Sequence, residues 1–157
     1  MKIVIIRHGE KPDNGDNLNC QGLNRAIALP KVLSAKFGVA SAIYIPTINP
    51  GDKTKSARMF QTITPYAVKY NLKVNSNFDT EDYKKIAKDV VQQKGTVIMV
   101  WEHNSIPHLV KAFGVQEDVR DWPDSDFDSI WIITYKKGVA TLTADKEGLN
   151  PSSGCPF

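Results

Sequence analysis

The sequence has no long hydrophobic run. None of its apolar stretches approaches the ~20 residues that a membrane-spanning helix needs. The amino-terminal run, with Lys2 before four apolar residues, is too short for the core of a signal peptide. We therefore expect a cytoplasmic protein with no membrane partner.

Cysteine and excess charge are also scarce. The two cysteines, Cys20 and Cys155, lie far apart and form no Cys-x-x-Cys pair, so the pattern favours reduced thiols over a zinc site or a disulfide framework. The net charge of +3 is modest and the basic residues are dispersed, which argues against a nucleic-acid partner and is compatible with a small anionic substrate. The 157 residues, 41% of them hydrophobic, fit one domain over residues 1–157.

Short apolar runs alternate with stretches of helical spacing. Residues 3–6, 42–45 and 96–101 have the composition of strands that are buried on both faces, as in parallel sheets. The alternation predicts a three-layer α/β/α sandwich with a mostly parallel central sheet. Four helices are expected: over 20–37 with Asn19 as cap and a kink or a split at Pro30, from Thr54 or Ser56 to 70 with a bend at Pro65, over 80–93 with Thr80 as cap, and over 105–113. A short strand is expected over 72–74 and a hairpin of 128–135 and 139–144. Loops are expected over 11–19, 46–52 and 115–128.

Basic side chains follow the predicted strands where ligands bind in open α/β sheets. Arg7 and His8 end the first strand, His103 follows the strand over 96–101, and Arg58 lies in the first turn of a helix. A cation in a first turn is unfavourable unless an anion binds close by. Two arginines and two histidines suit a phosphoryl group, because guanidinium groups match phosphate oxygens. A neutral His8, held by a backbone carbonyl near Gly9, could attack phosphorus itself.

These residues also carry a family resemblance. Arg7-His8-Gly9-Glu10 after the first strand, Ser56-x-Arg58 opening a helix that continues with Gln61-Thr62, and His103 after a late strand resemble the histidine phosphatase superfamily, the phosphoglycerate mutase-like proteins. The resemblance spans residues 3 to about 135. It implies that His8 is transiently phosphorylated, that Arg7, Arg58 and His103 hold the phosphoryl group, and that no metal or other cofactor is required. Glu10 and Asn104 are further candidates for substrate binding.

The carboxylate that usually protonates the leaving oxygen in this family is not identified by the sequence. In one branch it comes from the segment between the second arginine and the second histidine; in another, an Asp follows the second histidine, where this chain has Asn104. Small family members that act on phosphohistidine look able to dispense with the acid, because imidazole is a good leaving group. Glu81 is the first choice, and the alternatives are Asp79, Asp82, Glu102, Glu10 or no acid at all.

The sequence thus predicts a metal-independent phosphatase that hydrolyses phosphomonoesters through a phosphohistidine intermediate on His8. A mutase is less favoured, because a short chain leaves little to build a cap that excludes water. Two alternatives stay open: a phosphatase of phosphohistidine in a partner protein, and a binder of phosphorylated ligands that has lost turnover. The partner is then a small phosphorylated substrate or a phosphoprotein, and the sequence does not indicate an oligomeric state.

Overall fold

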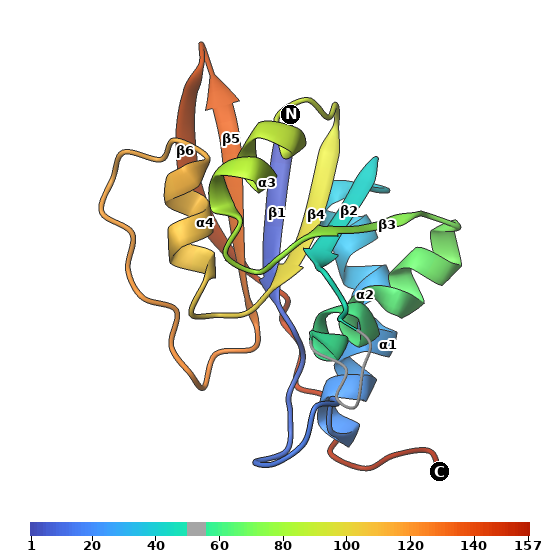
Figure 1. Ribbon diagram of the computed structural model, residues 1–157. Helices are drawn as coiled ribbons and strands as arrows, with labels where there is room; N and C mark the ends of the chain where they lie inside the picture. Colours follow the sequence, from blue (N-terminus) through green and yellow to red (C-terminus); the bar gives the residue numbers. More distant parts are fainter. Residues whose placement is uncertain (50–55) are drawn as a thin grey trace.

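One six-stranded sheet forms the centre of the molecule (Figure 1). The computed structural model describes residues 1–49 and 56–157. In chain order the elements are β1 (Lys2–Arg7), α1 (Cys20–Phe37), β2 (Ala42–Pro46), α2 (Ala57–Tyr70), β3 (Val74–Phe78), α3 (Tyr83–Val90), β4 (Thr96–Trp101), α4 (Ile106–Ala112), β5 (Ser129–Lys136) and β6 (Val139–Lys146).

The sheet is mostly parallel, as predicted. Its strand order is β3-β2-β4-β1-β5-β6, in which β3, β2, β4 and β1 are parallel neighbours, while β5 pairs in the antiparallel sense with both β1 and β6. Helices α3 and α4 cover one face and α1 and α2 the other, so the predicted three-layer α/β/α sandwich is confirmed. No helix within the described ranges combines the length and the apolar character that crossing a membrane requires.

The side chains of β1 show why this strand is the core of the sandwich. Ile3 and Ile5 pack in the hydrophobic cluster beneath α3 and α4, whereas Val4 and Ile6 pack in the cluster beneath α1 and α2. All four are fully buried. Alternate residues of a strand point to opposite faces, so a continuous apolar run is what a central strand needs.

Helix α1 has the predicted bounds and the predicted cap. Asn19 Oδ1 accepts a hydrogen bond from the Gly22 amide at 2.9 Å, which satisfies one of the unpaired donors of the first turn. The helix continues through Pro30, so the alternative of two separate helices is wrong. Pro30 is buried, and we attribute the continuity to tertiary packing that offsets the hydrogen bond which proline cannot donate.

Other boundaries differ from the predictions. The third strand is β3, later than the predicted 72–74, because an edge strand tolerates polar residues such as Asn75 and Asn77 that hide its pattern. Helix α3 is shorter than predicted, and Asp82, not Thr80, precedes it. Ser56 precedes α2 but is left-handed, with φ of 59°, and makes no capping bond. Thr54, the other predicted cap, lies outside the described residues.

The prediction of reduced thiols is wrong in this structure. Cys20 and Cys155 form a disulfide, with Cα atoms 5.0 Å apart and a sequence separation of 135. The chain after β6 is irregular and returns to the start of α1. Asn24 Nδ2 holds it there by donating to the carbonyls of Ser152 and Gly154, at 2.8 and 2.7 Å. The spacing of the two cysteines in the sequence could not indicate this disulfide, because it forms only when the fold brings the two distant segments together.

Candidate active site

The site lies where β1 and β4 end side by side. Arg7 and Trp101, the last residues of the two strands, are paired across the sheet. The His8 amide continues this pairing by donating to the Trp101 carbonyl at 3.2 Å. Arg7, His8 and His103 therefore follow two neighbouring parallel strands at one sheet edge, as the sequence predicted.

His8 is a buried and neutral imidazole. Its ring is held by a contact of 2.7 Å between Nδ1 and the Gly9 carbonyl. Because a carbonyl only accepts, Nδ1 carries the hydrogen and Nε2 keeps its lone pair. Burial lowers the pKa of His8 to about 4, against the effect of the Gly9 bond, and the charges of Arg7 and Arg58 act in the same direction as burial. At neutral pH His8 is thus in the form that a nucleophile requires.

Helices α1 and α2 fix the backbone that directly follows His8. The Gly9 amide donates to Thr62 Oγ1 at 2.9 Å, and the Thr62 hydroxyl donates to the Arg58 carbonyl at 2.7 Å. A Cβ at Gly22 of α1 would lie 2.2 Å from the Glu10 carbonyl oxygen, so only glycine permits this close approach. Thr62, which lies one turn after Arg58 in α2, therefore connects this helix to the residue that follows the nucleophile.

Arg7 is buried, and none of the carboxylates in residues 1–49 and 56–157 forms an ion pair with its guanidinium group. Its Nη1 donates to the backbone carbonyls of Asp124 and Asp126, at 2.5 and 3.2 Å, and the ring of Phe127 lies 3.8 Å from the guanidinium carbon. Its Nε has no hydrogen-bond partner within the described ranges. Burial lowers the pKa of Arg7 to about 10, although nearby acidic residues oppose this.

Arg58 reaches from the first turn of α2 to the loop between β1 and α1. Its guanidinium group donates to the Gly15 carbonyl and, through Nε at 3.2 Å, to the Asn17 carbonyl. Gln61 joins the same loop through its side-chain amide, which lies 2.6 Å from Asn17 Oδ1 and accepts from the Leu18 amide at 3.0 Å. The predicted loop over 11–19 therefore borders the site and orients Arg58.

His103 is partly open to solvent, with 13% of its side chain exposed. Its Nε2 lies 2.6 Å from Asp124 Oδ1. Its Nδ1 is buried and has no hydrogen-bond partner in the part of the chain that the structure describes. The ring is thus oriented by a carboxylate that the sequence analysis did not select.

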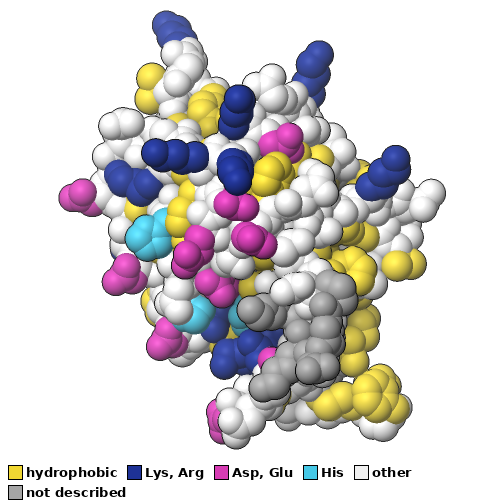
Figure 2. Space-filling model, viewed as in Figure 1, with side chains coloured by type: hydrophobic (Ala, Val, Ile, Leu, Met, Phe, Trp, Pro, Cys, Tyr) yellow, Lys and Arg dark blue, Asp and Glu magenta, His cyan; other side chains and the backbone are white. Residues whose placement is uncertain are grey.

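Three hollows surround these residues. The His8 pocket, of about 120 Å³, includes His8, Arg58 and Glu102 in its lining. The His103 hollow, of about 390 Å³, includes His103 and Asn104. Figure 2 shows histidine, basic and acidic side chains gathered on the lower part of one face. The predicted acids Asp79, Glu81 and Asp82 line a third hollow of about 460 Å³, which shares Ser56 with the His8 pocket.

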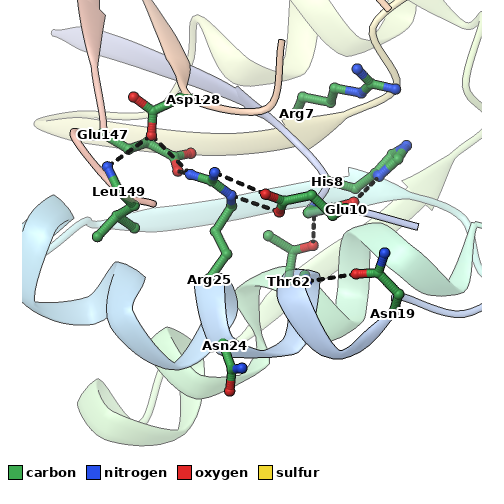
Figure 3. A network of polar contacts seen from close by, with 12 residues as sticks. Arg7, His8, Glu10, Asn19, Asn24, Arg25, Thr62, Asp128, Glu147 and Leu149 are labelled. Carbon is green, nitrogen blue, oxygen red and sulfur yellow. Dashed lines mark hydrogen bonds and ion pairs between the residues drawn. The ribbon is translucent and has the colours of Figure 1, made fainter. Parts of the chain in front are cut away.

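Glu10, a candidate for substrate binding in the sequence analysis, is not among the residues that line the His8 pocket. Both of its carboxylate oxygens accept from Arg25, at 2.8 and 3.0 Å. Arg25 also contacts Asp128 at 2.9 Å and Glu147 at 2.5 Å, and we call these four residues the Arg25 cluster. Figure 3 shows the Glu10 carboxylate turned toward Arg25 and away from the His8 ring. These two bonds orient the Glu10 carboxylate toward α1.

The sequence analysis missed the segment over 122–128, which it described as an acidic, irregular loop. This segment supplies the Phe127 ring on Arg7, the Asp124 carboxylate at His103 and the Asp128 carboxylate of the Arg25 cluster. A signal was present in the sequence, because Trp122 and Phe127 are large aromatic residues within a short acidic run. Aromatic residues in such a loop indicate that it packs on the molecule.

Among the residues that the structure describes, no group of three or more His, Cys, Asp or Glu side chains is arranged to hold a metal ion. The positive charge of the site comes from Arg7 and Arg58, with the histidines beside them.

Comparisons with known proteins define the fold. The chain is similar to the structure of the protein histidine phosphatase SixA complexed with tungstate, with a TM-score of 0.68 and 16% identity over 94% of this chain and 97% of that one. It is also similar to a mycobacterial glucosyl-3-phosphoglycerate phosphatase solved with inorganic phosphate (TM-score 0.61, 12% identity, 92% and 95% of the two chains). A third similar structure is the alpha-ribazole phosphatase of Shigella flexneri (TM-score 0.54, 12% identity, 100% and 99%). No family model and no curated protein sequence matches the chain.

The protein therefore has the fold of the phosphoglycerate mutase-like histidine phosphatases, as the resemblance in its motifs predicted. The identities of 12–16% leave the activity of this particular chain to be argued from its own residues.

Proposed function

We propose that the protein is a phosphatase that hydrolyses phosphomonoesters through a phosphohistidine intermediate on His8 and needs no metal ion. The observation that carries this proposal is a buried, neutral imidazole beside Arg7 and Arg58, whose described hydrogen bonds go to backbone carbonyls. Carbonyl oxygens satisfy N–H groups but leave the positive charge available to an anion. Two of the similar proteins were solved with tetrahedral oxyanions, tungstate and phosphate, which supports a phosphoryl ligand.

The proposed reaction has two displacement steps. His8 Nε2 attacks phosphorus, the bond from phosphorus to the leaving oxygen breaks, and the phosphoryl group is transferred to His8. Water then attacks the same phosphorus, the phosphorus–nitrogen bond breaks, and inorganic phosphate leaves with His8 neutral again. Arg7, Arg58 and His103 are proposed to hold the three outer oxygens and to stabilise the charge that develops on them. Asn104, exposed beside His103, is proposed to contact the substrate outside the phosphoryl group.

A second candidate is a phosphatase of phosphohistidine in a partner protein. The similarity to SixA, described as a protein histidine phosphatase, favours this candidate. The predicted acid Glu81 also lies in a different hollow from His8, and an imidazole leaving group does not depend on such an acid. Both candidates use His8 in the same way and differ in the leaving group.

Hydrolysis of a generic aryl phosphate by the protein and by His8→Ala, each with and without a chelator, tests the proposal. We expect activity that resists the chelator and that is lost in His8→Ala. Activity that survives in His8→Ala would refute the nucleophile, and activity lost to the chelator would refute metal independence. A histidine-phosphorylated carrier protein, assayed in parallel with sugar phosphates, separates the two candidates. Tight binding of phosphate or vanadate without hydrolysis of any substrate would instead indicate a binder of phosphorylated ligands.

A further inference from the structure

The segment over 122–128 is a fixed wall of the site. Trp122 Nε1 donates to the Asp126 carbonyl at 2.7 Å, and the Asp126 carboxylate accepts from the amides of Asp128 and Ser129, both at 3.0 Å. Phe127 packs on the guanidinium group of Arg7. The position of Asp124 within this segment is therefore set by its neighbours on both sides.

Asp124 contacts two of the proposed phosphate-binding residues at once. Its carbonyl accepts from Arg7 Nη1 at 2.5 Å, and its carboxylate oxygen Oδ1 lies 2.6 Å from His103 Nε2. Its side chain is 93% exposed, although its partner His103 is largely buried. A hydrogen bond between an imidazole nitrogen and a carboxylate oxygen requires one proton between them. The structure thus places a carboxyl group and a proton at the open side of the site.

The other candidate acids are differently engaged. Both oxygens of Glu10 are bonded to Arg25. Glu102 Oε1 accepts from the Ser105 hydroxyl at 2.7 Å. Glu81 lines the hollow that lies beyond Ser56. Among the carboxylates that the structure describes, Asp124 is the one in hydrogen-bond contact with a proposed phosphate-binding side chain.

We propose that Asp124 is the acid and base of this site, an inference that rests on the proposed function. When a phosphoryl oxygen takes the place of Asp124 Oδ1 at His103, the carboxyl group lies next to the transferring phosphoryl group. The shared proton stays on His103 Nε2, which donates it to that phosphoryl oxygen, and the Asp124 carboxylate takes the proton that the phosphomonoester monoanion carries. As the bond from phosphorus to the leaving oxygen breaks, that oxygen takes this proton from Asp124. In the second step water attacks phosphorus and gives its proton to the Asp124 carboxylate, which passes it to the departing phosphate, so that the carboxylate is restored.

The same geometry places the leaving group. Asp124 lines the His103 hollow together with Asp121, Trp122 and Pro123. Its volume of about 390 Å³ is roughly three times that of the His8 pocket, at about 120 Å³. A leaving group in the larger hollow has its bridging oxygen beside Asp124, while the phosphoryl group remains at His8.

Two esters and three variants test this inference. One ester has an alkoxide leaving group that needs a proton, and the other has dinitrophenolate, which leaves without one. In Asp124→Asn we expect the alkyl ester to lose about 10²- to 10⁴-fold in kcat/KM, the range of a general acid, with little change for the activated ester. Asp121→Asn is the matched control, because Asp121 lines the same hollow. Glu81→Gln tests the acid that the sequence favoured, and neither control is expected to separate the two esters.

The activated ester also reports whether the variant site is intact. An equal loss on both esters would overturn the inference, because Asp124 would then only orient His103. Unchanged hydrolysis of the alkyl ester would overturn it as well, and so would a selective loss in Glu81→Gln. In any of these cases, if His8→Ala abolishes hydrolysis of both esters, the proposed function stands while the role of Asp124 fails. Hydrolysis that persists in His8→Ala would instead refute the proposed function.

Discussion

Arg7 and Arg25 are both almost fully buried, but their guanidinium groups have opposite surroundings. Arg25 lies against Glu10, Asp128 and Glu147. Burial alone would lower the pKa of Arg25, but the hydrogen bonds and charges of these carboxylates raise it above its ordinary value. For Arg7, whose hydrogen bonds go to two backbone carbonyls, burial prevails and lowers the pKa to about 10.

This difference separates a structural charge from a functional one. The compensated Arg25 joins the loop after β1 to the chain around β5 and β6, because its carboxylate partners come from all three places. Arg7, which has no ion-pair partner among the described residues, lies beside the neutral His8, where a bound anion would balance its charge. Four predictions test this distinction.

Arg25→Met should give the largest loss of stability. Removing one partner of a buried ion network leaves its other charges unpaired, which costs about 3–5 kcal/mol in the free energy of unfolding. Urea denaturation measures this change. Lys36→Met is the control, since Lys36 pairs with Asp145 at 3.0 Å on the surface and such pairs contribute about 1 kcal/mol or less. Equal losses of stability in the two variants would show that the Arg25 cluster contributes no more than a surface ion pair.

Arg7→Met should act on catalysis instead. Losing a charged group that stabilises the transferring phosphoryl group should lower kcat/KM for an aryl phosphate by about 10²- to 10³-fold. The free energy of unfolding should stay the same or rise, because an uncompensated buried charge is removed. Steady-state kinetics and urea denaturation on one preparation give both values. A variant that keeps its activity but loses stability would show that Arg7 is structural.

The disulfide should contribute to stability without contributing to chemistry. Cys20→Ser with Cys155→Ser should lower the free energy of unfolding by about 2–4 kcal/mol, since the crosslink restricts the unfolded chain. Hydrolysis of a small aryl phosphate should be unchanged under conditions where the variant is folded. A reducing agent should destabilise the parent protein to the level of the double variant and leave the double variant unaffected. Equal stability with and without reductant in the parent would contradict the crosslink.

The smallest effect concerns the titration of His8. Its pKa is lowered to about 4, chiefly by burial and further by Arg7. The folded protein therefore resists protonation of His8 as the pH falls below the ordinary histidine pKa of about 6.5. Nuclear magnetic resonance of the His8 ring should show a midpoint near pH 4 that rises in Arg7→Met, with His8→Asn assigning the signal. A midpoint near 6.5 in the parent protein would contradict a buried, neutral nucleophile.

The sequence could predict those parts of the site that depend only on local sequence pattern and on the geometry of a parallel sheet. Arg7 and His8 end one buried strand, His103 follows another, and parallel strands end at a common edge, so their proximity followed from the apolar runs. Arg58 was identified by its place in a first helical turn. These inferences required only the order of elements and the burial of each strand.

The missed features depend on contacts between distant segments. Arg25 meets Glu147 across 122 residues, and Cys20 meets Cys155 across 135. Neither pair has a local pattern, because each depends on how the chain after β6 returns to α1. Asp124 was missed for a related reason, since a carboxylate in an irregular segment has no periodicity that gives its direction. The direction of the Glu10 side chain was missed as well, since the sequence placed it with its neighbours Arg7 and His8, whereas it turns to Arg25 of α1.

The most direct test of the central claim is to locate the phosphoryl group during turnover. The protein is mixed with excess aryl phosphate, quenched in alkali within the first turnovers, and its peptides are mapped by mass spectrometry. The proposed mechanism predicts an acid-labile phosphoryl group on His8 that is absent in His8→Ala. Turnover with a phosphoryl group on another residue, such as His103, or with no phosphorylated protein at any quench time, would contradict it.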